Sequence, residues 1–195
     1  MRWPGFELVL TIAALAGITA GYWWLARLAV PRPNSAIGYA LGITGFAMML
    51  GTETLYSLRK RAKGLQFGPM NAWLQVHTFL GIVGPYLVLL HSGWRFHGLA
   101  GYAAAVLGVV VLSGLVGRYL FASAPHYLDG IETPAGRLDG NAADRKRMKQ
   151  EIRSQERARR LFALWHVCHI PLSAGLFVLA AAHIGGAVYY AILAR

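Results

Sequence analysis

The chain has 195 residues, of which 56% are hydrophobic and only 14% are charged, and its formal net charge is +11. This composition excludes an ordinary soluble domain and predicts one membrane domain of four to six helices, since each crossing needs about 20 apolar residues. The single Cys168 excludes an intrachain disulfide, so no function based on cysteine chemistry is expected.

Five apolar stretches predict an all-α fold, an integral membrane helical bundle with five transmembrane helices. They cover about residues 6–30, 36–58, 72–94, 99–121 and 161–194, and each is long enough to span the hydrocarbon. The first is too long for a signal peptide and ends in Arg27 and Pro31 instead of a small-residue cleavage site, so a retained helix is expected. An odd number of spans places the two termini on opposite sides.

Two basic loops, 59–71 and 122–160, fall on one side of this topology. The positive-inside rule makes that side and the N-terminus cytoplasmic and the C-terminus external, in a multi-pass protein of the cell's inner (cytoplasmic) membrane. The net charge then reflects topology and attraction to membrane lipid, and no nucleic-acid partner is expected. The charged run from Asp144 to Arg160 is expected to be a solvated loop; a surface helix, with a docking site for a soluble partner, is the alternative.

Histidines are the informative residues in the predicted spans. His77 and His91 lie on the third span, and His169 and His183 lie on the fifth; both pairs are separated by 14 residues. That separation is about 21 Å along a helix with a drift of about 40° around it, so each pair points from one face at two depths. Because both helices run outward, His77 matches His169 at the inner level and His91 matches His183 at the outer level.

Two imidazoles from neighbouring helices at one level are the axial ligands that a six-coordinate haem iron needs. The spacing therefore predicts two b-type haems, an inner iron held by His77 and His169 and an outer iron held by His91 and His183. Histidines hydrogen-bonded between helices, or a proton relay, are the alternatives. Zinc and copper fit less well, since each level offers only two histidines.

Other residues have several interpretations. His166 is a second candidate for the inner ligand, or a contact of a haem propionate or a quinone head group, but His169 keeps the better register with His183. Arg118, near the cytoplasmic end of the fourth span, is either a propionate contact or a positive flank of the helix. His97 is expected at the membrane interface, and His126 has no predicted partner. No residue is assigned a catalytic role.

The paired spacing His77-x13-His91 and His169-x13-His183 resembles the ferric-reductase-like transmembrane domain of NADPH oxidases, metalloreductases and the haem subunit of bacterial methionine sulfoxide reductase systems. The likeness covers about residues 40–190, and it implies a helical bundle with non-covalent b haems at those four histidines. The run Trp165-His166-Val167-Cys168-His169-Ile170-Pro171 also resembles stand-alone bacterial b-type cytochromes that work beside multihaem or iron–sulfur partners. Unlike flavin-containing members, the chain has no Gly-rich dinucleotide fingerprint, so it needs a partner for its electrons.

The sequence thus predicts a di-haem b-type cytochrome subunit of an oxidoreductase complex. It would carry electrons across the membrane between a donor or acceptor on the cytoplasmic side, a protein or quinone, and a redox partner on the opposite face. The alternative is a terminal haem reductase that acts directly on a small acceptor such as ferric iron or oxygen. A non-redox transporter or assembly factor is a third interpretation.

Overall fold

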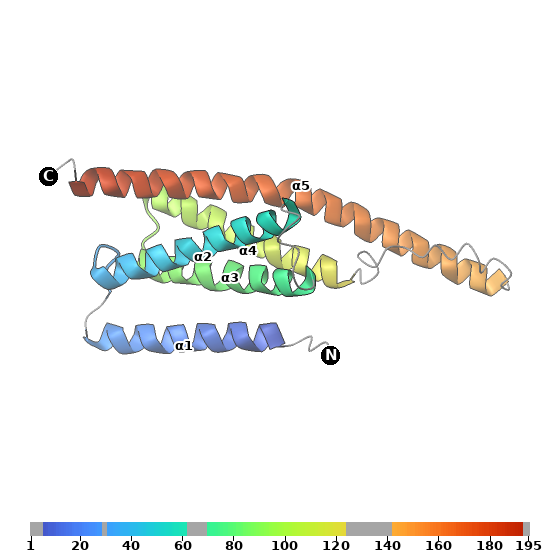
Figure 1. The fold of residues 1–195 in the computed structure, drawn as a ribbon, viewed down its shortest axis with the longest axis horizontal. Coiled ribbons are helices and arrows are strands. Elements are labelled where there is room, and N and C mark those ends of the chain that lie inside the picture. The colour runs from blue at the N-terminus through green and yellow to red at the C-terminus, as the bar shows by residue number, and fades with distance from the viewer. Residues whose placement is uncertain (1–5, 29–30, 62–69, 124–141, 193–195) are drawn as a thin grey trace.

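Every regular element in the described part of the chain is an α-helix, which confirms the predicted all-α fold. The computed structural model describes residues 6–28, 31–61, 70–123 and 142–192. The helices are α1 (Phe6–Leu28), α2 (Ala36–Arg61), α3 (Met70–Ser92), α4 (Gly98–Ser123) and α5 (Ala142–Ile192). Helices α2 to α5 run up and down, each packed on the next, and α1 packs against α3 (Figure 1).

Four of the five helices are long and apolar enough to cross a membrane, which indicates a multi-pass membrane protein. The segments are Phe6–Leu28, Ala72–Ser92, Gly98–Arg118 and Glu156–Ile192. Helix α2 has 26 residues, but its glycines and the polar run Thr52, Glu53 and Thr54 make it less apolar than the others. The structure therefore supports four of the five predicted spans by length and composition.

A cap at the start of α2 and a tight turn between α3 and α4 help to set how these helices begin and end. Ser35 caps α2, since its hydroxyl accepts a hydrogen bond from the backbone N–H of Gly38 at 3.1 Å. Between α3 and α4, the turn uses positive φ angles at Gly93 (55°), Trp94 (61°) and Gly98 (58°). The backbone N–H of Trp94 also donates to the Ser92 hydroxyl at 3.2 Å, which stabilises this tight reversal.

The predicted spans match the observed helices closely except at the start of α5. This helix begins at Ala142 and has 51 residues, so residues 142–160 are helical and the predicted solvated loop is wrong there. In Figure 1 the first part of α5 continues beyond the ends of the other helices. The predicted loop residues 62–69 and 124–141, which include His126, lie outside the described residues.

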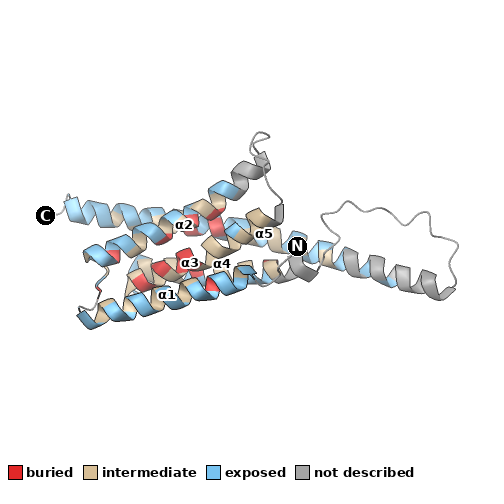
Figure 2. Ribbon diagram, turned by 60° about the horizontal axis from the view of Figure 1, so that its bottom comes forward, coloured by how far each residue is buried: buried red, intermediate tan, exposed pale blue. Residues whose placement is uncertain are grey.

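Two ends of the bundle can be defined from the helix ends. We call the end with Phe6, Met70 and Arg118 the N-terminal end, and the end with Leu28 and Ile192 the C-terminal end (Figure 1). Buried positions gather on α2 and α3, whereas α1 and α5 are largely exposed (Figure 2). Exposed apolar side chains are expected on helices that face lipid.

Candidate functional site

Helices α2 and α3 meet in a register that repeats every seven residues. At the C-terminal end, Nδ1 of His91 lies 2.8 Å from the carbonyl oxygen of Gly38. In the middle, a Cβ added to Gly84 would lie 3.0 Å from the carbonyl oxygen of Gly45. At the N-terminal end, Nδ1 of His77 lies 3.2 Å from the carbonyl oxygen of Thr52. Three glycine or threonine positions on α2 thus pair with three positions on α3, each seven residues apart.

These contacts determine which ring nitrogen carries a proton in the two α3 histidines. A backbone carbonyl only accepts hydrogen bonds, so Nδ1 of His77 and Nδ1 of His91 must each carry a proton and donate it. In a neutral ring the lone pair then belongs to Nε2, the nitrogen that binds a metal in this tautomer. The backbone of α2 therefore fixes the orientation of both imidazole rings.

Close packing supports the position of the His91 ring. A Cβ at Gly42 would lie 3.0 Å from two atoms of the His91 imidazole, which is tighter than ordinary van der Waals contact. Glycine at this position therefore lets the ring lie directly against α2. His77 and His91 are both half-buried, as expected for polar rings between helices.

On the other side of the bundle, α4 positions His169 of α5. The Ser113 hydroxyl lies 3.0 Å from Nδ1 of His169, and the Ser113 carbonyl accepts a hydrogen bond from Nε1 of Trp165 at 2.7 Å. The Trp165 ring stacks on His169 with centroids 4.8 Å apart and an interplanar angle of 24°. A Cβ at Gly117 would overlap the Trp165 ring, so glycine is needed for this arrangement.

His169 and His77 come from different helices but belong to one level. His77 is bonded to α2 and His169 to α4, both toward the N-terminal end of the bundle. Yet within the described residues no Cα of α3 lies within 8 Å of a Cα of α5. Helices α3 and α5 therefore do not pack directly against each other.

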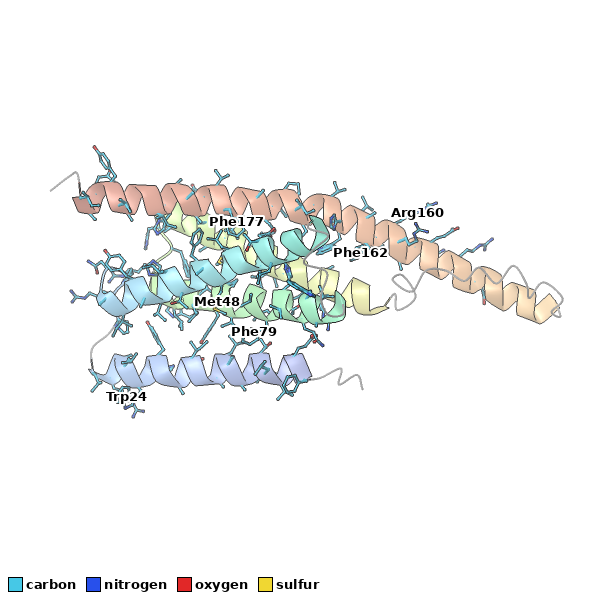
Figure 3. The ribbon with its side chains drawn as sticks, in the orientation of Figure 1. Trp24, Met48, Phe79, Arg160, Phe162 and Phe177 are labelled. Atoms are coloured by element: carbon cyan, nitrogen blue, oxygen red, sulfur yellow. The ribbon has the colours of Figure 1, made fainter. Side chains whose placement is uncertain are left out.

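An apolar layer separates this level from the C-terminal end. Met49 of α2, Leu107 of α4 and Leu176 of α5 form a buried cluster, and Val88 of α3 packs against it. Phe177 of α5 also reaches Phe46 of α2, with ring centroids 6.1 Å apart (Figure 3). Leu176 lies seven residues from His169 and seven from His183, so the layer lies midway between the two levels.

His183 is the fourth predicted ligand. It is half-buried on α5, and no described residue forms a hydrogen bond with its ring. By helix register it lies two heptads from His169, at the depth at which His91 lies relative to His77. The structure thus gives His91 a backbone partner, whereas it places His183 at that level by register alone.

The remaining predicted residues have other surroundings. His166 lies near Phe162 and Trp165, with ring centroids 6.2 Å and 6.0 Å away, and has no hydrogen bond to a described residue. His97 is exposed in the turn between α3 and α4. Arg118 forms an ion pair with Glu7 of α1, and their side chains are 27% and 14% exposed.

The predicted histidines would suit a metal ion that a prosthetic group already coordinates and that needs only two further ligands from the protein. Among the described residues, no three His, Cys, Asp or Glu side chains are grouped to hold a metal ion. Each level instead offers two imidazoles, which is sufficient for an iron whose other four ligands come from a porphyrin. The tautomers of His77 and His91 and the separation of α3 from α5 agree with this use.

Comparison with protein-family models, with curated proteins and with solved structures found no match.

Several residues of the site were not predicted. The carbonyls of Gly38 and Thr52 and the hydroxyl of Ser113 orient three of the histidines. One signal was present in the sequence, because Gly38, Gly45 and Thr52 repeat at the seven-residue interval of His77, Gly84 and His91. Ser113 carried no such signal, since a serine in an apolar helix commonly bonds its own backbone.

Proposed function

We propose that the protein is a di-haem b-type cytochrome subunit that carries electrons across the membrane. The observation that carries this proposal is the pairing of histidines at two levels, two heptads apart on both α3 and α5. The prepared tautomers of His77 and His91 support it, because a histidine fixed in this way by a carbonyl binds metal through Nε2.

His77 and His169 are the proposed ligands at the N-terminal end, and His91 and His183 are those at the C-terminal end. The hydrogen bond between Ser113 and Nδ1 of His169 and the stacked Trp165 support His169 over His166 as the α5 ligand. Both contacts restrain the ring, and second-shell restraints of this kind are common at metal ligands. His166, one turn away, lacks a hydrogen bond to any described residue.

Haem b, when bound, supplies a reversible one-electron carrier whose potential depends on its ligands and surroundings. The chain's own residues set the geometry: the two ligand pairs lie about 21 Å apart along the helix axes. Met49, Leu107 and Leu176 occupy the space midway and exclude water from it. Neither level alone spans the bundle, so transfer across it needs both.

We further propose that α2 is the fifth transmembrane helix of a protein in the inner (cytoplasmic) membrane. In this orientation the N-terminal end of the bundle faces the cytoplasm. Helix α2 packs along α3 through all three levels, so it shares the depth of a spanning helix. Arginines beyond the N-terminal end of the bundle, Arg153, Arg157 and Arg160, support this orientation. Redox proteins on one or both faces, and a quinone, are the proposed partners.

The test is electron transfer through vesicles that contain the reconstituted protein. With dithionite outside and ferricyanide trapped inside, wild-type protein should reduce the trapped acceptor. His91→Ala removes one ligand at the C-terminal end, so it should retain one haem and slow transfer at least tenfold. His97→Ala is the matched control, because His97 is exposed at the same end, and it should transfer at the wild-type rate. Undiminished transfer in a His91→Ala protein shown to lack one haem would contradict the relay.

A further inference from the structure

The first part of α5 carries a row of exposed arginines beyond the bundle. Arg153, Arg157 and Arg160 are spaced by four and three residues, and all three are exposed. The structure shows no ion pair for them among the described residues. Arg145 and Lys149 precede them on the same helix at four-residue spacing. We call these five residues the basic row; residues three or four apart on a helix share one face.

Arg153 and Arg160 lie on the side of α5 opposite to the one that faces the bundle. His169 and Leu176 mark the bundle-facing side, since one bonds to α4 and the other lies in the apolar layer. At about 100° per residue, Arg153 and Arg160 are turned about 160° to 180° from His169. Figure 3 shows Arg160 on the part of α5 that continues past α2 and α3. Glu156 is the acidic residue beside the three arginines among the side chains that the structure describes.

We infer that the basic row docks the acidic face of a soluble one-electron carrier protein; the redox character of this partner rests on the proposed function. Complementary charge steers such encounters and sets the orientation of the partner. Three exposed arginines at helical spacing, preceded on the same helix by two further basic positions, favour an acidic surface over a neutral one.

Two features favour a protein over an anionic membrane surface. From Arg145 to Arg160 the row extends about 22 Å along a helix that leaves the bundle, whereas the potential of a charged membrane decays within a Debye length of about 8–10 Å. A helix that lies in the membrane interface also needs a broad apolar face. Between Ala142 and Arg160 the large apolar residues are only Met148 and Ile152.

The row also lies close to the histidine level at the N-terminal end. Arg160 precedes His169 by nine residues, about 14 Å along the helix. Between them, Phe162 lies 5.2 Å from Trp165 by ring centroids, and Trp165 stacks on His169. A partner held on the basic row is therefore placed beside the site that would exchange electrons with it.

Binding of poly-L-glutamate to the full chain in phosphatidylcholine nanodiscs tests the charge of the surface. The triple variant Arg153→Gln, Arg157→Gln, Arg160→Gln should bind this probe at least about tenfold more weakly than wild type. The matched control removes three exposed arginines at the C-terminal end, Arg27→Gln, Arg32→Gln and Arg95→Gln, and should bind within twofold of wild type. Equal binding by the two triple variants would overturn the inference.

A label at residue 150 distinguishes the protein partner from the membrane. Gln150→Cys, made with Cys168→Ser, carries a fluorescent label on the exposed side chain next to the row. Its access to an aqueous quencher should be the same in nanodiscs of phosphatidylcholine and in nanodiscs that also contain phosphatidylglycerol. Protection by phosphatidylglycerol would show that the row binds lipid and would overturn the inference.

Electron delivery from reduced flavodoxin, an acidic one-electron carrier, tests the redox part. The haem-loaded arginine triple variant should be reduced at least about tenfold more slowly than wild type, and the control should not. Failure of the two proposals can be distinguished. A colourless protein that binds poly-L-glutamate contradicts the proposed function, whereas a haem-loaded protein that binds neither probe contradicts only the docking surface.

Discussion

At the scale of single residues, the choice between His166 and His169 is the sharpest point. His169 is held by Ser113 and Trp165. We therefore expect His169→Ala to lose one of two haems, while His166→Ala keeps both. Haem content of the purified variants by pyridine haemochrome measures this directly. The reverse pattern would make His166 the ligand.

The two depths of the histidines on α3 and on α5 could be predicted from the sequence, because helix geometry turns a 14-residue interval into two depths on one face; their use as ligands stays a prediction. Ring orientation could not be predicted. It depends on the carbonyl oxygens of Gly38 and Thr52, which belong to another helix and have no side-chain signature. The ion pair between Arg118 and Glu7 was missed for the same reason, since it joins α4 to the first turn of α1.

Arg118 forms an ion pair with Glu7 and still has N–H groups that could bind a second anion. Its guanidinium pairs with one oxygen of Glu7, while the other oxygen, Oε2, is buried without a hydrogen-bond partner among the described residues. A guanidinium has five N–H donors, so the pair with Glu7 leaves capacity for a second anion. Contact with a haem propionate therefore stays a prediction, and the ion pair adds a role in anchoring α1.

At the scale of helices, the contact between α2 and α3 controls both levels. Gly84→Leu would drive a side chain into the backbone of α2, where a Cβ alone lies 3.0 Å from the Gly45 carbonyl oxygen. We expect a loss of about 1–3 kcal/mol in stability, together with loss of haem at both levels, because both α3 histidines lose their carbonyl partners. Thermal unfolding and haem content measure the two effects.

Gly108→Leu on α4 is the matched control for this variant. Gly108 is exposed, and a Cβ there would have no neighbour within 4 Å. The same substitution should therefore leave the unfolding temperature and the haem content near wild type. A Gly84→Leu protein as stable and as rich in haem as the control would show that the close approach of α2 and α3 is not required.

Helix positions could be predicted better than helix ends. Apolar length located all five helices, since a span needs about 20 apolar residues. The start of α5 could not be located in this way, because residues 142–160 are mostly charged or small and carry no apolar pattern. Their helical propensity is the better indicator, since Arg, Lys, Gln, Glu and Ala all favour helix.

At the scale of the whole molecule, heptad intervals connect the four helices of the bundle into three layers. Thr52 bonded to His77, and Ser113 paired with His169, mark the layer at the N-terminal end. Met49, Leu107 and Leu176 mark the middle, and Gly38 and His91 mark the C-terminal end together with His183 by register.

The measurement that tests this account most directly is the haem content of the intact wild-type protein purified from membranes. Two histidine levels, each with two imidazoles at equivalent depths, predict b-type haem at a ratio near two per chain by pyridine haemochrome, with the spectrum of bis-histidine ligation. A ratio near one, a colourless protein or covalently attached haem would contradict the account, because the repeated 14-residue spacing on α3 and α5 would then have no use in electron transfer.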